Sequence, residues 1–327
     1  MKILYIYRHP NMGYSIGKVF NSIELLMKKI VEVDSIYLPV PNYSIKGLWK
    51  NIRYARQYCR ENKFDIVHIT GSEHYLLPFL RNEKTIITIH DIGFYTNNKL
   101  SFRNILKYLF WIKILPLASY VTFISEKSKN EVLKLVKLDN LKYSIIQNPI
   151  ASEFSAHPKV INKLYPTILH VGVGSNKNLD TTVIALKDLP CKFKIVGKLT
   201  EKQKFILKLY NIHYESISNL TDEEILDEYI NCDVVNFPSL YEGFGMPIIE
   251  GQSIGRPVMT SNLSPMKDVA GNAAVLVNPT CPKSIREGYE LLLTHADEYV
   301  EKGLENVKRF SLTRIVQQYI DIYNRIL

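Results

Sequence analysis

Two carboxylates, Glu242 and Glu250, stand eight residues apart in the stretch FPSLYEGFGMPIIE, which ends at residue 250. The apolar residues before it predict a buried strand, and Pro247 suits the first turn of a following helix. Such a turn presents free backbone N–H groups and the positive end of the helix dipole to an anion. Carboxylates accept hydrogen bonds from sugar hydroxyls. The stretch is typical of a site for a ligand with hydroxyls and an anion; the alternative is a strand–helix turn without a ligand.

A lysine occupies a comparable turn earlier in the chain. The strand expected over Thr167–Val173 is followed by Lys177, and Asn178 is a candidate N-cap of the next helix. A lysine beside a helix N-terminus suits a diphosphate, because the charge of that group must be offset as it departs. A lysine taken alone is more often a surface residue, so this interpretation depends on where the turn lies in the fold.

The sequence contains no D-x-D or H-E-x-x-H motif and no His/Cys set with ligand spacing, so we expect neither a metal nor a cofactor. Its four cysteines are scattered singly, which is typical of a reducing compartment. No apolar run approaches the roughly 18 residues of a membrane-spanning helix. The N-terminus reads as a strand and not as a signal peptide. We therefore expect a cytoplasmic protein.

Short β-branched runs alternate with helical patterns, which predicts α/β architecture with parallel sheets. In the first half we expect strands at Lys2–Tyr7, Ser35–Val40, Asp65–Thr70, Thr85–His90, Tyr120–Ile124 and Tyr143–Ile146, and helices at Ile16–Ile30, Ile45–Cys59, Phe102–Leu115 and Glu126–Val136. In the second half we expect strands at Thr167–Val173, Lys192–Val196, Val234–Phe237, Pro257–Ser261 and Ala274–Val277, capping boxes at Thr200–Gln203 and Thr221–Glu224, and helices from Lys283 to the C-terminus.

Three prolines, at 149, 158 and 166, punctuate a polar stretch between the two patterns. We therefore expect two doubly wound domains, residues 1–155 and residues 156–327, with C-terminal helices in the second. Sheets of this kind bind ligands beyond the carboxyl ends of their strands. Two of them predict a cleft between the domains that is lined by the loops after the strands.

These features resemble the family 4, or group 1, glycosyltransferases, which have the GT-B fold of two facing Rossmann-like domains. The stretch from 242 to 250 looks like their E-x7-E signature, and the likeness continues through Gly251–Val258 and Asp268–Gly271 to Val277–Pro279. It covers most of the second domain strongly and the first domain loosely. The resemblance implies a retaining transfer from a nucleotide-diphosphate sugar, with the donor held by the second domain.

The resemblance also implies roles for single residues. Glu242 would contact the hydroxyls of the donor sugar, Glu250 would bind the ribose, and Lys177 would grip the diphosphate. Many members carry an arginine shortly before this lysine, which this sequence lacks. The remaining donor-binding candidates that lie beside these three in the sequence are Gly243, Phe244, Gly245, Met246, Pro247, Asn176 and Asn178. A further candidate is Ile217, in a separate segment that in the family brings backbone groups to the nucleobase.

The first domain contributes further candidates. His90, followed by Asp91, resembles the family's His-Asp turn, whose histidine reaches the donor sugar near the reacting centre, so we group it with Glu242 and Lys177 as catalytic. The alternative is a structural hydrogen bond. The segment from 11 to 17 matches the glycine-bearing loop of the family but lacks its usual Gly-Gly pair; its donor-binding candidates are Gly13, Ser15 and Gly17. His68 reads as a buried core histidine.

The net charge of +9 is concentrated in the first half. Residues 1–155 contain 22 Lys+Arg and 12 Asp+Glu, a balance of +10, whereas residues 156–327 contain 19 and 20, a balance of −1. The segment Lys46–Arg60 has five cations and no acid. On a helix these cations fall within an arc of about 120° that includes Trp49. Such a stripe suits an anionic membrane surface, and the alternative is a solvated helix face.

We therefore expect a retaining, metal-independent hexosyltransferase that acts in bacterial surface polysaccharide synthesis. Its partners would be a nucleotide sugar, a glycan or polyprenyl-diphosphate-linked acceptor, and the inner face of the cytoplasmic membrane. A sugar-nucleotide epimerase of the same architecture is an alternative, which would consume the nucleotide sugar without an acceptor. A protein that binds nucleic acid or another anionic surface is a third possibility, but the carboxylate loop would repel a phosphate backbone, so we expect no nucleic acid partner.

Overall fold

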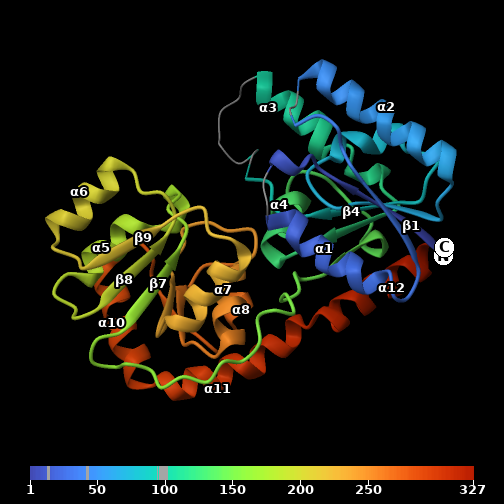
Figure 1. The fold of residues 1–327 in the computed structure, drawn as a ribbon. Helices are drawn as coiled ribbons and strands as arrows, with labels where there is room; N and C mark the ends of the chain where they lie inside the picture. Colours follow the sequence, from blue (N-terminus) through green and yellow to red (C-terminus); the bar gives the residue numbers. More distant parts are fainter. Residues whose placement is uncertain (13–14, 42–43, 94, 96–101) are drawn as a thin grey trace. The chain divides into compact units, whose positions relative to one another are not determined.

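The computed structural model describes residues 1–327 except 13–14, 42–43, 94 and 96–101. The chain forms two compact units (Figure 1). The first unit comprises Met1–Pro149 and Leu312–Leu327, and the second comprises Ile150–Ser311. Each unit has its own parallel sheet and its own core, as the alternating pattern of the sequence predicts.

The first unit is built on a six-stranded parallel sheet with the order β2-β1-β3-β4-β5-β6. Its central strands are mainly apolar, and nearly all of their residues are buried because helices cover both faces. The edge strand β2 is mostly half-exposed and begins three residues earlier than expected, since an edge strand need not be apolar. The strands are β1 (Lys2–Tyr7), β2 (Glu32–Tyr37), β3 (Ile66–Ile69), β4 (Thr85–Ile89), β5 (Tyr120–Phe123) and β6 (Tyr143–Ile145).

Helices α2 and α3 lie on the same side of the first unit (Figure 1). The α-helix expected over residues 102–115 is interrupted, because a π-turn follows α3, with the Lys113 N–H donating to Tyr108 O. The helices of this unit are η1 (Pro10–Met12), α1 (Ser15–Met27), α2 (Ile45–Asn62), η2 (His74–Phe79), α3 (Phe102–Lys107), η3 (Tyr108–Ile112), η4 (Leu115–Leu117), α4 (Glu126–Leu133), η5 (Asn140–Lys142) and α12 (Leu312–Ile326).

The second unit is built on a six-stranded parallel sheet with the order β12-β11-β10-β7-β8-β9. Five of its strands match the expected ones. The edge strand β9 was not predicted, because its residues are half-exposed and form no apolar run. The strands are β7 (Thr167–Val171), β8 (Lys192–Val196), β9 (Tyr214–Ile217), β10 (Val234–Phe237), β11 (Val258–Ser261) and β12 (Val275–Val277).

The helices of the second unit confirm both expected capping boxes, in which Thr200 caps α6 and Thr221 caps α7. They are η6 (Ser175–Lys177), α5 (Leu179–Leu186), α6 (Glu201–Leu209), α7 (Asp222–Asn231), α8 (Met246–Ile254), α9 (Met266–Ala270), α10 (Pro282–Thr294), α11 (Ala296–Asn306) and η7 (Val307–Phe310).

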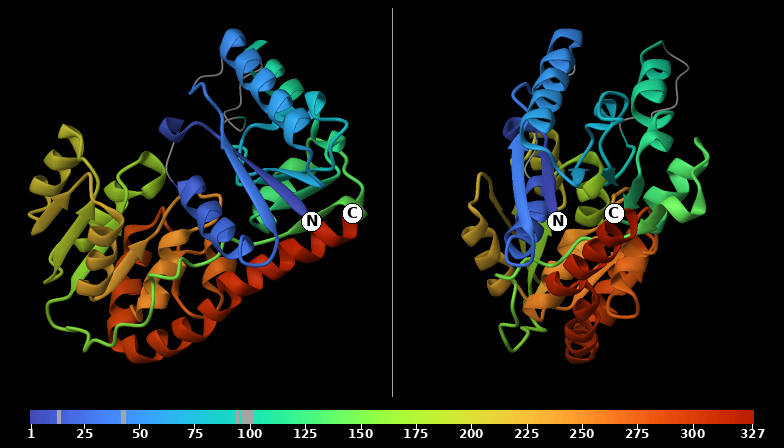
Figure 2. Two further views of the ribbon diagram at one scale, coloured as in Figure 1. Left: turned by 45° about the vertical axis from the view of Figure 1, so that its right-hand side comes forward. Right: turned by 90° about the vertical axis from the view of Figure 1, so that its right-hand side faces the viewer.

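The C-terminal helix α12 belongs to the first unit and not to the second, where the sequence had placed it (Figure 2). Its apolar face packs near α1, and Tyr323 donates or accepts a hydrogen bond with Tyr5 at 3.0 Å. The amphipathic pattern of this segment shows that one face is buried, but it does not show which sheet covers that face.

His68 is a fully buried core histidine, as expected. Its two ring nitrogens lie 2.8 Å from the hydroxyls of Tyr323 and Thr88. Burial lowers the pKa of His68 to about 3 and, together with smaller effects of neighbours, the pKa of His74 and of His90 to about 4. These side chains are therefore neutral in the folded protein at pH 5.

The lowered histidine pKa values predict a loss of stability in acid. Between pH 6.5 and about 4 the unfolded chain binds protons that the folded chain does not, so the free energy of unfolding falls as the pH falls. Each such histidine contributes up to about 1.4 kcal/mol per pH unit in this window. We expect His68→Gln to flatten this dependence by about one histidine's share. The measurement is urea unfolding at pH 4.5–7.5, followed by tryptophan fluorescence, with the exposed His295→Gln as control. An unchanged slope in His68→Gln would contradict this account.

Candidate functional site

Lys177 lies at the edge of the second sheet where strands β7 and β10 end. It closes the short helix η6 that follows β7, and its Nζ lies 2.7 Å from Glu242 Oε1. Lys177 and Glu242 are both largely buried, with 23% and 15% of their side chains exposed. Two candidates that are 65 residues apart in the sequence are thus in direct contact.

The stem of Lys177 is held by its neighbours. Its Nζ lies 4.7 Å from the centroid of the Phe237 ring, which is a cation–π contact. Its side-chain carbons pass over Gly172, where an added Cβ would lie 3.0–3.3 Å from them. Gly172 also has a φ of +94°, which favours glycine. The position of the lysine therefore depends on a glycine that looks like an ordinary turn residue in the sequence.

Asn176 joins the two loops. Its side-chain amide donates to Glu242 Oε1 and to Tyr241 O, both at 3.1 Å, and its carbonyl accepts the N–H of Leu240 at 2.8 Å. The turn that carries Lys177 and the loop that carries Glu242 are thereby fixed to each other through both side-chain and backbone bonds.

The loop between β10 and α8 places a glycine at the start of the helix. Gly245 stands at the N-cap of α8 with a φ of +123°, and its carbonyl accepts the N–H of Ile248 at 3.0 Å. Pro247 lies in the first turn, where a missing N–H costs nothing. Phe244 is buried and packs edge-on against Phe310, with ring centroids 5.8 Å apart. The flanking residues Gly243 and Met246 are half-buried.

Glu250 lies on α8, on the turn after Pro247. It accepts a hydrogen bond of 2.6 Å from the hydroxyl of Tyr229, a fully buried residue of α7. Burial, and then the charge of Glu250, raise the pKa of Tyr229 well above its ordinary value, so the tyrosine stays a donor. The tyrosine orients the carboxylate, although nothing in its sequence surroundings distinguished it from a core aromatic.

Asn178 links the loops of the site to one another through its side chain. The expectation that its side chain caps α5 is wrong, because the residue adopts a left-handed conformation (φ 63°) and makes no side-chain cap. Its amide donates instead to Pro238 O at 3.0 Å and to Pro279 O at 2.6 Å. The side chain therefore ties the turn of Lys177 to the loops that follow β10 and β12.

His170, on β7, was not singled out from the sequence. Its Nδ1 lies 2.8 Å from the side-chain nitrogen of Asn236 on β10. Burial and, to a lesser extent, the nearby charge of Lys177 lower the pKa of His170 to about 3. The histidine is therefore neutral beside the lysine at physiological pH.

In the first unit, His90 follows β4 and is buried. Its Nε2 donates to Thr70 O at 2.9 Å, because a carbonyl can only accept. Nε2 of His90 thus makes a structural hydrogen bond, which the sequence left open as the alternative to a catalytic role. Since the pKa of His90 lies near 4, the ring is neutral and its Nδ1 carries an acceptor lone pair.

The remaining donor-binding candidates from the sequence are Gly13, Ser15, Gly17 and Ile217. Gly13 lies outside the described residues, and Ser15 and Gly17 lie in the first turn of α1. Ile217 ends β9, and its carbonyl accepts the N–H of Gly197 at 2.7 Å. Among the described residues, no three His, Cys, Asp or Glu side chains are grouped as metal ligands would be. No helix in this part of the chain has the length and apolarity needed to cross a bilayer.

Two family descriptions match successive parts of the chain. "Glycosyltransferase Family 4" matches residues 19–154, and "Glycosyl transferases group 1" matches residues 152–309. The serotype-specific mannosyltransferase WbdA of Escherichia coli is 23% identical over an alignment of 288 positions, which covers 78% of this chain and 33% of WbdA. The chain therefore spans only about a third of that relative's length.

Solved structures share the fold over the whole chain. Sucrose-phosphate synthase from Thermosynechococcus elongatus has a TM-score of 0.83 at 18% identity, with 100% of this chain and 99% of that chain covered. Anabaena Alr3699/HepE, solved in complex with UDP and glucose, has a TM-score of 0.74 at 14% identity, with 99% and 100% covered. At these identities the likeness establishes the GT-B fold alone.

The bonds of Asn178 predict that it stabilises the site. Asn178→Gly keeps the left-handed backbone available but removes both side-chain bonds, so we expect the free energy of unfolding to fall by about 2–3 kcal/mol. Asn211, also left-handed but exposed, is the matched control, and Asn211→Gly should change it by less than about 0.5 kcal/mol. Urea denaturation followed by circular dichroism measures both. Equal effects of the two substitutions would contradict the bracing role.

Proposed function

The chain belongs to the group 1, or family 4, glycosyltransferases, and from this premise we propose that it is a retaining, metal-independent hexosyltransferase. Its donor is a nucleoside-diphosphate sugar and its acceptor a glycan or a lipid-linked glycan of bacterial surface polysaccharide. The observation that carries this proposal is the contact of Lys177 with Glu242 at the carboxyl edge of the second sheet, beside the N-terminus of α8.

Lys177 binds the diphosphate of the donor in this proposal. Its charge and the backbone N–H groups at the start of α8 offset the charge that develops as the sugar–phosphate bond breaks. These groups supply the charge that a divalent cation supplies in other transferases, which is why we propose a reaction without a metal. Because Glu242 already contacts Lys177, a diphosphate that binds there competes with this carboxylate for the ammonium group and leaves Glu242 to accept from sugar hydroxyls.

Transfer with retention follows if the acceptor approaches the sugar from the side of the departing diphosphate. The bond from the anomeric carbon to the diphosphate breaks, the bond to the acceptor oxygen forms on the same face, and the acceptor proton passes to the diphosphate. Glu250, oriented by Tyr229, binds the ribose. Neutral His90 accepts a hydrogen bond from a donor-sugar hydroxyl at Nδ1, since its Nε2 is engaged with Thr70.

The names of the similar proteins indicate which donors to test first. WbdA is a mannosyltransferase, and HepE was solved with UDP and glucose. A nucleoside-diphosphate mannose and UDP-glucose are therefore the first donors for a thermal-shift screen, because a donor raises the unfolding temperature according to its affinity.

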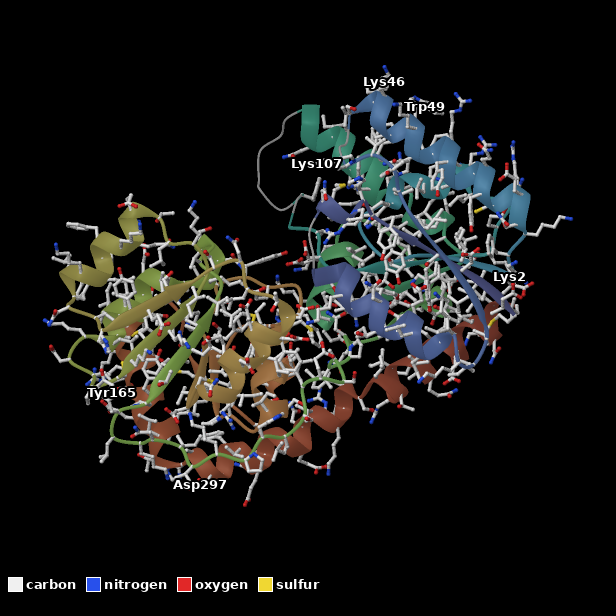
Figure 3. The ribbon with its side chains drawn as sticks, in the orientation of Figure 1. Lys2, Lys46, Trp49, Lys107, Tyr165 and Asp297 are labelled. Carbon is white, nitrogen blue, oxygen red and sulfur yellow. The ribbon has the colours of Figure 1, made fainter. Side chains whose placement is uncertain are left out.

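The first unit binds the cytoplasmic face of the membrane in this proposal. Helix α2 carries a basic stripe that includes Lys46, Lys50 and Arg53, and it also exposes 52% of Trp49. Figure 3 shows Lys46, Trp49 and Lys107 at one end of this unit. An anionic leaflet attracts such a surface by about 1 kcal/mol per basic residue.

The role of Lys177 predicts a large loss of turnover when its charge is removed. We expect Lys177→Ala and Glu242→Ala to lower kcat by roughly 10²–10³ while the protein stays folded. The measurement is sugar transfer from the donor found in the screen, with the anomeric configuration of the product read by proton NMR. Lys202→Ala, which removes an exposed lysine of the same unit, is the control. Near-normal turnover in both site variants would exclude this assignment.

The basic stripe predicts salt-sensitive membrane binding. We expect flotation with phosphatidylglycerol vesicles at low salt and release at high salt. Replacing Lys46 and Lys50 by Gln should weaken binding roughly tenfold to thirtyfold. The matched control replaces Lys202 and Lys208 of the second unit. The membrane proposal fails if the unaltered protein does not float at low salt.

A further inference from the structure

The first unit contains an apolar pocket between α2, η2 and the α3–η3 segment. Its volume is about 710 Å³, which is within the range of small-molecule sites. Five of its eleven lining residues are aromatic, namely Trp49 from α2, Tyr75 and Phe79 from η2, and Phe110 and Trp111 from η3. Trp49 and Phe79 pack edge-on with ring centroids 5.5 Å apart. The wall is therefore formed by side chains that pack against one another.

The pocket opens to solvent through apolar side chains. Ile45 is 78% exposed, Trp49 52% and Phe110 48%. Exposing such side chains together is unfavourable in water, and clusters of this kind mark binding surfaces. The π-turn contributes to the cluster, since it brings Phe110 and Trp111 to the same pocket as Leu106 and Lys107.

The lining of the pocket is connected to His90 through the chain that follows β3. Ser72, which lines the pocket, follows β3 two residues after Thr70, whose carbonyl binds His90. The indole N–H of Trp111 donates to Ser72 O at 2.7 Å, and the carbonyl of Trp111 is bonded to Nδ1 of His74. The pocket therefore lies at the same carboxyl edge of the first sheet as His90.

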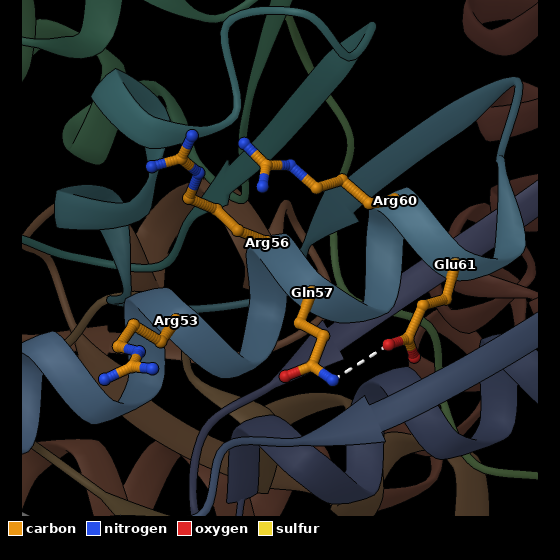
Figure 4. Close-up of a pocket in the computed structure, with 5 residues that line it drawn as sticks. All are labelled: Arg53, Arg56, Gln57, Arg60 and Glu61. Atoms are coloured by element: carbon orange, nitrogen blue, oxygen red, sulfur yellow. Dashed lines mark hydrogen bonds between the residues drawn. The ribbon is translucent and has the colours of Figure 1, made fainter.

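A cationic hollow lies further along α2. It has a volume of about 430 Å³ and is lined by Arg53, Arg56, Gln57, Arg60 and Glu61. Figure 4 shows Arg56 and Arg60 extending to the same side of the helix, while Gln57 donates to Glu61 at 2.8 Å on another side. Within the described residues, none of the three arginines forms an ion pair with an acid. Like charges four residues apart destabilise a helix, and a bound anion relieves this repulsion.

The apolar pocket and the cationic hollow lie next to each other along α2, as the apolar tail and the charged head group of one amphiphile would need. Trp49 and Arg56 are seven residues apart, which on an α-helix places them on nearly the same side at a separation of about 10 Å. A hydrocarbon chain in the apolar pocket would therefore have its head group beside the arginines. Guanidinium groups bind phosphate oxygens in a bidentate manner.

We propose that this pocket binds the isoprenoid chain of a lipid-linked acceptor, with the phosphate groups of that lipid at Arg56 and Arg60. The binding of the lipid stands on the pocket and the arginines alone, whereas its role as acceptor rests on the proposed function. The pocket draws one lipid chain out of the bilayer at the edge of the sheet where His90 lies, and the arginines hold its phosphate groups further along α2, towards the opposite edge of the sheet.

The protein offers a direct probe of this pocket. It contains two tryptophans, Trp49 and Trp111, and both line the pocket, so its tryptophan fluorescence reports there and not at the donor site. We expect geranylgeranyl diphosphate to produce a saturable blue shift. Inorganic pyrophosphate, which lacks the chain, should produce none.

Matched variants separate the chain from the head group. Phe110→Ser should weaken binding of geranylgeranyl diphosphate about tenfold, because a large apolar contact is lost. Arg56→Gln combined with Arg60→Gln should also weaken it roughly tenfold. The controls are Leu25→Ser and Arg81→Gln, which alter exposed residues of the same unit outside both sites. Ile45→Ser is the second pocket variant if Phe110→Ser lowers the unfolding temperature.

The outcomes are distinct from those of the donor experiments. A shift with phosphatidylglycerol vesicles but none with geranylgeranyl diphosphate would reduce the pocket to a membrane contact and overturn the proposal. A full shift with pyrophosphate, or equal affinities in the pocket and control variants, would overturn it as well. In each case stabilisation by a nucleotide sugar and the effect of Lys177→Ala would be unaffected, so the glycosyltransferase assignment would be tested separately.

Discussion

Strands β7 and β10 lie side by side in the second sheet although 62 residues of chain lie between Val171, where β7 ends, and Val234, where β10 begins. Ile168 lies opposite Val234 and His170 opposite Asn236. The donor half of the molecule depends on this pairing. Parallel neighbours end at the same edge, so the turn after β7 and the loop after β10 must meet, and the contact between Lys177 and Glu242 follows. The braces at Asn176 and Asn178 then limit how far the two loops can separate.

The fold was largely predictable because most inner strands of both sheets are short, mainly apolar and β-branched runs, as parallel sheets covered on both faces favour. The features that were not predicted depend on tertiary neighbours. Strand β9 is half-exposed at an edge, so it lacks that run. The π-turn after α3 involves Trp111, whose indole bonds to Ser72 from a distant loop. The apolar face of α12 fits a helix of either unit, and its tertiary contacts, such as those with Tyr5 and His68, show which one it covers.

The candidate site was predictable to the extent that chemistry follows strands in this fold. The rule that ligands bind beyond strand ends, together with a family signature, selected Lys177, Glu242 and Glu250. It could not reveal that Gly172 leaves room for the lysine stem, or that Tyr229 holds Glu250, because both residues look like ordinary turn and core positions. For Asn178, in contrast, the sequence pattern led to a specific prediction that was wrong. An asparagine before a helix is a good N-cap, but its left-handed backbone turns the side chain towards two proline carbonyls instead.

In the first unit too, the proposed ligand, a lipid, lies beyond the carboxyl end of a strand. Its strand β3 leads to Thr70, which holds His90, and then to Ser72, which lines the apolar pocket. A neutral histidine is suited to this place, since the desolvation that keeps the pKa of His90 near 4 also favours an apolar ligand nearby. A charged imidazolium would disfavour burial of a hydrocarbon chain beside it. The burial of His90 at the carboxyl edge of the first sheet therefore suits both its hydrogen bond with Thr70 and the binding of a lipid nearby.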